Sequence, residues 1–309
     1  MAESRVSIGA SLSYALSLWR SSARSIWGVL ALNSLAWTVF NAGKFAANDT
    51  VTVCGFGAAV LLSLATLGSM YRIAFAENHP SDPGFVPGHL GLQWGRLEWR
   101  LLGASALLAL FLFVMMALAA VAVSAVSIGV LMNKRGAAGQ ATPEALAAAL
   151  GPQGMAIIAA LGPQGMTMAR AIGPQGMEVF MLMATLVYLG TVYVFFRLIL
   201  TWVATADGGR MQVLATWRLT RGAFWRILVS VIGVWLPVYF MEFLVVGLAE
   251  SAQVDPAALI QLPAGGAVAG GLALGALTGA LAIPLTAGVL AYYYRQLKVP
   301  AAVGNDKSP

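Results

Sequence analysis

Two ionisable residues, Arg197 and Glu242, stand inside long apolar runs of the sequence. Charged side chains within a membrane are costly, so they commonly mark ion pathways, proton relays or charge pairs. Glu242 comes fifteen residues after Ile227, which is roughly 22 Å along a helix and predicts a position in the outer third of a membrane. We predict a buried contact between Glu242 and Lys44, with Asn41 one turn deeper, that fixes helix packing or gates a polar cavity. The alternative is a carboxylate that simply reaches the outer interface.

Arg197 is predicted at the opposite depth, near the inner end of its span. A long basic side chain in this position can extend to the lipid headgroups while its stem stays in the apolar layer. We therefore expect Arg197 either to reach the inner interface in this way or to serve a polar site.

Signatures of catalysis are absent from the sequence. It contains no His-Glu-x-x-His motif, no phosphate-binding loop and no Gly-x-Ser-x-Gly motif. His79, Asp82 and His89 could in principle hold a metal, but the proline-rich stretch around them favours an irregular loop. Cys54 is the only cysteine, so neither an internal disulfide nor a cysteine-based metal cluster is possible. We predict no metal, no cofactor and no enzymatic activity.

The composition indicates a membrane protein as the setting for these residues. The 309-residue chain is 59% hydrophobic and 10% charged, against about 25% charged residues in soluble domains. A spanning helix needs about 20 apolar residues, and six segments qualify: 26–44, 51–71, 101–131, 179–202, 227–248 and 265–294. We predict an all-α polytopic bundle of six transmembrane helices that forms a single membrane domain over 1–309.

The distribution of basic residues predicts the orientation of the bundle. With the N-terminus inside, only Lys44, Lys134, Arg135 and Arg170 of the 18 basic residues lie outside. Cytoplasmic segments are the ones that carry excess Lys and Arg, so we predict a multi-pass plasma-membrane protein with both termini in the cytoplasm. The pI is about 9.7, and because the basic residues flank apolar runs we expect anionic headgroups of the cytoplasmic leaflet as partners, and no nucleic acid.

Three segments that mix Trp with Arg precede predicted spans one, three and five. We call 18–27 (LWRSSARSIW), 94–100 (WGRLEWR) and 216–225 (TWRLTRGAFW) the Trp–Arg segments. The first and third align without a gap, and the pattern suits a short amphipathic helix on the inner leaflet. We predict three tandem units, each an interfacial helix followed by a transmembrane hairpin; alternatively, any inner membrane boundary gathers Arg and Trp. The predicted interfacial anchors are Trp19, Arg20, Trp27, Trp94, Trp99, Arg100, Trp217, Arg218, Trp225 and Arg226.

A second repeat lies in the predicted outer loop, 132–177. The pentapeptide Gly-Pro-Gln-Gly-Met begins at Gly151, Gly162 and Gly173, with short apolar stretches between the copies. The segment is too broken to span a membrane and too apolar for a free linker. We expect it on the outer leaflet or over the bundle; a tandem duplication with no dedicated role is the alternative.

The sixth predicted span carries Gly271, Gly275 and Gly279 at four-residue spacing. Small residues at this spacing let helix backbones approach closely, which predicts packing inside the bundle or, alternatively, a dimer contact. Pro237 and Pro284 lie within spans five and six and are expected to kink them.

One stretch resembles a known family. Arg197-Leu198-Ile199-Leu200, then Asp207 to Arg210, then Ala215 to Arg226 are similar to bacterial polytopic proteins related to the membrane domain of glycerophosphoryl diester phosphodiesterases. The resemblance covers roughly Arg197 to Leu236. It implies a six-span bundle and no enzyme here, since the family's phosphodiesterase activity belongs to a separate soluble domain, for which we expect no room after the last span. The Gly-Pro-Gln-Gly-Met repeats depart from the family's pattern.

Two functions fit these observations. The first is a non-enzymatic inner-membrane protein that acts as a scaffold, an accessory subunit or a lipid-handling module, with lipids and a further protein or a second copy as partners. The second is a small transporter or channel that uses Glu242 and the kinked spans five and six. A polar cavity at mid-membrane would favour the second.

Overall fold

The computed structural model describes residues 7–80, 88–134, 182–208, 210, 213, 215–251 and 264–298. Over these ranges the chain is helical and contains no strand, as predicted. The chain divides into two compact bodies. The first body comprises Met1–Leu108 with Phe196–Pro309, and the second comprises Ala109–Phe195.

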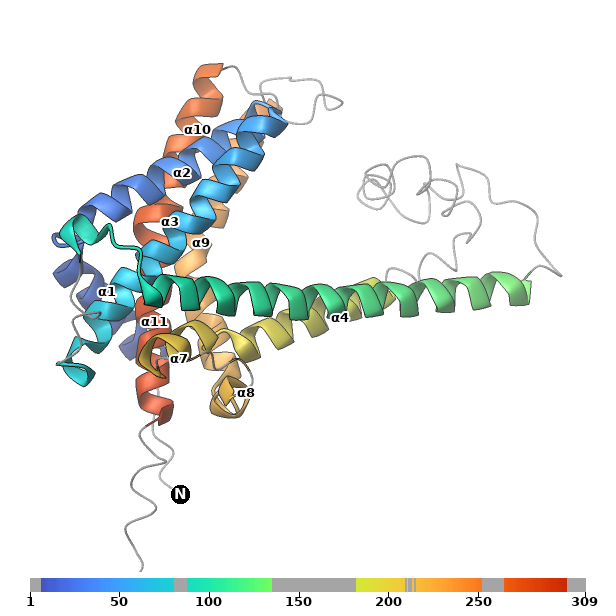
Figure 1. The fold of residues 1–309 in the computed structure, drawn as a ribbon. Coiled ribbons are helices and arrows are strands. Elements are labelled where there is room, and N and C mark those ends of the chain that lie inside the picture. Colours follow the sequence, from blue (N-terminus) through green and yellow to red (C-terminus); the bar gives the residue numbers. More distant parts are fainter. Residues whose placement is uncertain are drawn as a thin grey trace, which may run out of the picture. The chain divides into compact units, whose positions relative to one another are not determined.

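Each predicted span coincides with helix (Figure 1). Three helices open the chain: α1 (Ile8–Ala23), α2 (Trp27–Phe45) and α3 (Asp49–Phe75). Short turns η1 (Ala76–Asn78) and η3 (His89–Gly91) lead to α4 (Arg96–Lys134), and a further helix covers 182–198. The rest of the chain forms α7 (Thr201–Gly208), α8 (Ala215–Leu219), α9 (Phe224–Ser251), α10 (Ala264–Ala276), the π-helical turn η4 (Leu277–Ala282) and α11 (Ile283–Lys298).

Five helical stretches are long and apolar enough to cross a membrane: Asp49–Asn78, His89–Ala119, Leu182–Gly208, Phe224–Gly247 and Val268–Lys298. This architecture is compatible with a multi-pass membrane protein. The first predicted span, α2, forms a helix of 19 residues but is not one of the five. Asn33, Asn41 and Lys44 make it the most polar of the predicted spans. The Gly-Pro-Gln-Gly-Met repeats lie outside the described residues.

The structure corrects the prediction of a separate interfacial helix before each hairpin. The segment 18–27 does contain the end of a helix, α1, and 216–225 contains the short α8. The segment 94–100 forms no separate helix, because the long helix α4 begins at Arg96 and carries Trp99 and Arg100 near its start. A run of good helix formers from Arg96 onward, with no glycine or proline until Gly103, explains this continuity.

The glycine stripe packs inside the first body, where α10 and η4 lie against α2. A Cβ atom on Gly275 would lie 2.6 Å from the Ser34 carbonyl oxygen. A Cβ on Gly279 would lie 2.5 Å from the Cα of Ser34. Backbone atoms cannot move aside as a flexible side chain can, so the two helices meet at a distance that only glycine permits. Gly271 lies against the same helix, next to Thr38 and Ala42.

We predict that Gly275→Ala destabilises the protein by about 1–3 kcal/mol, the usual effect of overpacking a tight helix contact. Gly57→Ala and Gly233→Ala are matched controls, because a Cβ at either position has no neighbour within 4 Å. These two changes should leave stability equal or slightly higher, since alanine is the better helix former. Thermal unfolding in detergent measures all three, and equal melting temperatures would contradict the proposed close contact.

Candidate functional site

Lys44 and Glu242 form an ion pair between α2 and α9, through Lys44 Nζ and Glu242 Oε1. The partnership expected from the sequence is therefore present. The pair is not buried, however, because the side chains of Lys44 and Glu242 are 45% and 34% exposed. Asn41 does not join the pair, because its side-chain amide donates to the Trp37 carbonyl in its own helix at 2.8 Å. The site at this end of the bundle is an exposed charge pair flanked by Phe243, which is itself largely exposed.

Arg197 is buried, so the simple picture of a side chain extended to the headgroups does not describe it. Its guanidinium carbon lies 4.7 Å from the ring centroid of Trp217. Its backbone carbonyl accepts a hydrogen bond from Thr220 Oγ1 at 3.0 Å. A cation held over an indole face is attracted by the ring's negative face, more strongly away from water. The residue thus joins the end of helix 182–198 to the Trp–Arg segment 216–225.

Arg72 and Glu98 form the most deeply buried charge pair described. Nη1 lies 2.6 Å from Oε1 and Nη2 donates to Oε2 at 2.6 Å, with side-chain exposures of 1% and 0%. The Gly95 amide adds a 2.8 Å hydrogen bond to Oε2. Gly68 leaves the room for this carboxylate, since a Cβ there would lie 2.1 Å from Oε1. Removing one partner would leave an uncompensated buried charge, which typically costs about 3–5 kcal/mol.

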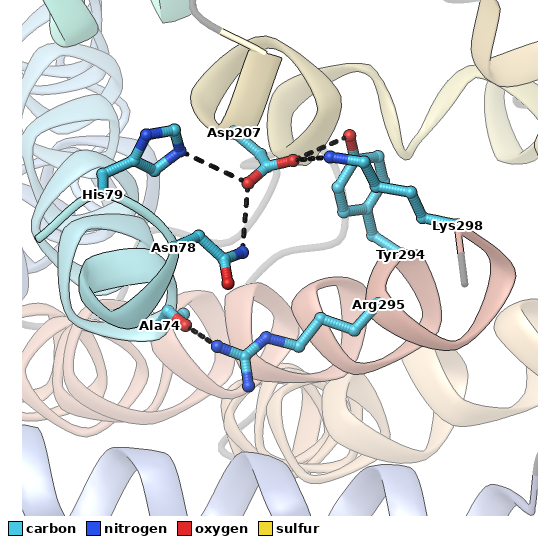
Figure 2. Close-up of polar contacts among 7 residues, drawn as sticks. All are labelled: Ala74, Asn78, His79, Asp207, Tyr294, Arg295 and Lys298. Atoms are coloured by element: carbon cyan, nitrogen blue, oxygen red, sulfur yellow. Dashed lines mark hydrogen bonds and ion pairs between the residues drawn. The ribbon is translucent and has the colours of Figure 1, made fainter. Parts of the chain in front are cut away.

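Asp207, at the end of α7, is the centre of a third polar cluster (Figure 2). Its Oδ1 accepts a hydrogen bond from Asn78 Nδ2 at 3.3 Å and lies 3.5 Å from His79 Nε2. Its Oδ2 accepts from the Tyr294 hydroxyl at 3.2 Å and pairs with Lys298 Nζ. One buried carboxylate therefore connects three segments: the turn after α3, α7 and the end of α11.

Beside this cluster, Arg295 docks on the end of α3. Its guanidinium donates to the Ala74 carbonyl, as Figure 2 shows. The same group lies 5.4 Å from the Phe75 ring and 5.9 Å from the ring of Tyr14 in α1. A single side chain of α11 thus contacts both α1 and α3.

Two carbonyl groups of the last span, those of Gly279 and Ala280, accept hydrogen bonds from side chains of other helices. Proline has no N–H, so Pro284 removes the one donor that would serve Ala280 in an α-helix or Gly279 in a π-helix. Asn33 Nδ2 donates to Gly279 O at 3.2 Å, and Trp19 Nε1 donates to Ala280 O at 2.9 Å. The kink expected at Pro284 stays a prediction; the structure has the π-turn η4 just before it, and side chains of α2 and α1 donate to the Gly279 and Ala280 carbonyl groups there.

The predicted anchors divide into two groups. Trp27, Trp99 and Trp225 are 56%, 62% and 72% exposed, as residues at a membrane boundary would be. Trp94, Arg20, Arg218 and Arg226 are also exposed, and Arg100 is partly so. Trp19 and Trp217 instead turn inward, to Ala280 and Arg197.

Among the described residues, no group of three or more His, Cys, Asp or Glu side chains could hold a metal ion. Asp82, one member of the conceivable metal set, lies outside those residues. His79 instead contacts Asp207. Cys54 is exposed and carries a free thiol.

Comparison with known proteins identifies no relative: no family model, curated protein or solved structure matches the chain. The likeness to the phosphodiesterase membrane domain stays a prediction.

Sequence reasoning did not single out Asn33, Arg72, Glu98 or Asp207 as site residues. Signals for three of them were present. Asn33 is an amide in an apolar run, and Glu98 is the only acidic residue in the three Trp–Arg segments. Arg72 follows a tyrosine near the end of its helix, as Arg295 does. Asp207 carried no such signal, because its partners come from segments distant in the sequence.

For the ion pair, we predict that Glu242→Lys destabilises the protein and that adding Lys44→Glu restores stability. The effect should be on the order of 1 kcal/mol, because exposed pairs contribute little. Melting temperatures of the two single variants and the double variant in detergent test this. A double variant no more stable than Glu242→Lys would show that the two side chains do not interact.

For the last span, we predict that Asn33→Leu costs about 1–3 kcal/mol, since it leaves a buried carbonyl without a donor. Pro284→Ala returns an N–H to the same turn, so the cost of Asn33→Leu should shrink in the Pro284→Ala background. Asn41→Leu is the control, because Asn41 bonds only to its own helix. Additive effects of Asn33→Leu and Pro284→Ala in a double-mutant cycle would exclude the compensation.

Proposed function

We propose that the chain is a non-enzymatic integral membrane protein of the bacterial plasma membrane that acts as a scaffold, an accessory subunit or a lipid-handling module. One observation supports this most: in the first body, polar side chains of one helix bond to side chains or backbone carbonyl groups of another. Asn33 bonds to Gly279, Arg72 to Glu98, and Asp207 to α11. Groups engaged in this way stabilise a bundle and are not free to bind a passing solute.

A second network of the same kind lies between α1, α9 and α11. The Ser11 and Ser230 hydroxyls are 3.1 Å apart, and Ser230 lies 2.9 Å from the Tyr293 hydroxyl. All three side chains are buried. Hydroxyl groups that bond across helices hold a membrane bundle together without exposing polar groups to lipid.

We further propose six spans, with α2 as the first, and both termini in the cytoplasm. α2 packs between α3 and α10, both parts of stretches long and apolar enough to span. Its polar side chains Asn33 and Asn41 are turned to protein partners rather than to lipid. With α2 counted as a span, 14 of the 18 basic residues fall on the inner side.

Cysteine labelling tests the orientation. In a Cys54→Ala background, we predict that Asp49→Cys reacts with an impermeant maleimide in intact cells, whereas Arg24→Cys and Glu77→Cys react only after lysis. All three positions are exposed. If Arg24→Cys and Asp49→Cys reacted from the same side, α2 would not cross the membrane.

Purification in mild detergent, followed by mass spectrometry of bound lipids and proteins, tests the function. We expect co-purified anionic phospholipid or a stoichiometric protein partner. The triple variant Arg218→Gln, Arg221→Gln, Arg226→Gln removes exposed cations of the inner boundary and should lower the amount of anionic lipid. Protein that carries neither lipid nor partner would contradict the proposal.

The second candidate is a small transporter or channel. The π-turn at Pro284 and the exposed Lys44–Glu242 pair favour it, because broken helices and intramembrane charges occur at transport sites. Proton flux into pyranine-loaded proteoliposomes under an imposed potential, lost in Glu242→Gln, would support this candidate over the first.

A further inference from the structure

An aromatic residue followed by arginine ends the membrane part of each predicted hairpin. The pairs are Tyr71-Arg72 in α3, Phe196-Arg197 in helix 182–198 and Tyr294-Arg295 in α11. Each hairpin also follows one of the three Trp–Arg segments. We define copy 1 as α1–α3, copy 2 as 94–208 and copy 3 as α8–α11. Every copy then carries a Trp–Arg segment before its predicted hairpin and places an aromatic–Arg pair toward its end.

Copies 1 and 3 correspond in contacts as well as in sequence. A shift of 198 residues aligns Trp19 with Trp217 and also Trp37 with Trp235. The Trp37 indole donates to Ser63 Oγ at 3.1 Å, and the Trp235 indole donates to Thr286 Oγ1 at 3.1 Å. In both copies the bond therefore runs from the first spanning helix to a hydroxyl on the second.

The same shift relates the two residues of the ion pair. Lys44 and Glu242 are 198 positions apart, so equivalent points of α2 and α9 meet each other. Residues contact their own equivalents only where repeated copies come together around a common axis. The pair thus marks where copies 1 and 3 come together.

Each arginine reaches the copy that follows its own. Arg72 of copy 1 pairs with Glu98 in the Trp–Arg segment of copy 2. Arg197 of copy 2 lies over Trp217 in the Trp–Arg segment of copy 3. Arg295 of copy 3 returns to copy 1, where it contacts Tyr14 and the end of α3.

The aromatic residues that precede Arg197 and Arg295 also contact the copy that follows their own. Phe196 of copy 2 packs edge to face on Phe224 of copy 3, with centroids 6.4 Å apart. Tyr294 of copy 3 packs edge to face on Phe75 of copy 1 at 6.0 Å. Asp207 lies where the copies converge: it ends copy 2 and bonds to Asn78, which follows copy 1, and to Lys298 of copy 3.

We infer that Arg72, Arg197 and Arg295 are equivalent joints that link the inner ends of three tandem copies into a closed circuit, with Asp207 as the shared anchor. The inference goes beyond the proposed function, because it holds whether the bundle serves as a scaffold or as a transporter. It assigns each arginine to one boundary: Arg295 to the boundary of copies 3 and 1, and Arg197 to that of copies 2 and 3.

Disulfide trapping in the full chain tests this assignment, in a Cys54→Ala background. Ser11→Cys with Ser230→Cys reports on the boundary of copies 3 and 1, where the hydroxyls are 3.1 Å apart. Thr201→Cys with Thr216→Cys reports on the boundary of copies 2 and 3, where they are 3.2 Å apart. Both pairs should cross-link rapidly in the parent, and failure of either would contradict the arrangement.

Arg295→Gln should slow the cross-link between positions 11 and 230 about tenfold and leave the one between positions 201 and 216 unchanged. Arg197→Gln should have the opposite effects. Loss of one desolvated cation–π contact has this order of effect. Tyr14→Leu removes the ring that Arg295 contacts and should act as Arg295→Gln does, and Trp217→Leu should likewise act as Arg197→Gln does. They keep the inference testable if an arginine variant does not fold. Arg20→Gln, at an exposed position of a Trp–Arg segment, should change neither cross-link. Equal slowing of both cross-links by either arginine variant would indicate general loosening and overturn the inference.

Discussion

Proline 284 imposes the constraint on which the packing of the first body depends. In a hydrocarbon layer no water can satisfy a freed carbonyl, so each must find a donor within the protein. Gly279 and Ala280 receive theirs from Asn33 of α2 and Trp19 of α1. These donors can reach the backbone only because Gly275 and Gly279 let α2 approach closely, and because Gly288 leaves room for Ala15 of α1. The irregular turn in the last span is thus tied to α1 and α2 by hydrogen bonds between residues far apart in the sequence.

Buried charges in the first body follow the same rule, because each is paired within the protein. Arg72 would be prohibitively costly alone, yet Glu98 and the Gly95 amide meet it in a pocket that Gly68 keeps open. Asp207 contacts four different side chains with two oxygens, and accepts hydrogen bonds from Asn78, Tyr294 and Lys298. Networks of this kind favour one arrangement of helices more strongly than apolar packing does, because any other arrangement leaves buried polar groups without partners, which costs free energy.

The sequence predicted the helices well, because apolar runs and their flanking charges are local properties. Within the described residues, helix occurs in each region predicted to span, and five helical stretches are long and apolar enough to cross a membrane; the more polar α2 is not one of them. The Lys44–Glu242 pair could be predicted because depth along a helix follows from counting residues. Asp207 could not, because its site is assembled from segments more than 80 residues away in the chain. The hydrogen bond of Trp19 could not be predicted for the same reason, because its acceptor, the Ala280 carbonyl, lies 261 residues later in the chain.

The charge pairs at the two ends of the first body differ in burial, and this difference affects where the body can move. At the end that carries Arg72, the Arg72–Glu98 pair and the Asp207 carboxylate are buried, whereas Lys298, which pairs with Asp207, is 59% exposed. Separating Arg72 from Glu98 would therefore expose charges that water does not already solvate. At the other end, Lys44 and Glu242 are already partly exposed, and each can exchange its partner for water or a headgroup at little cost. Motion between α2 and α9 is therefore cheapest at the end that carries Lys44. The π-turn at Pro284 lies between the two ends, in the helix that packs on both α2 and α9.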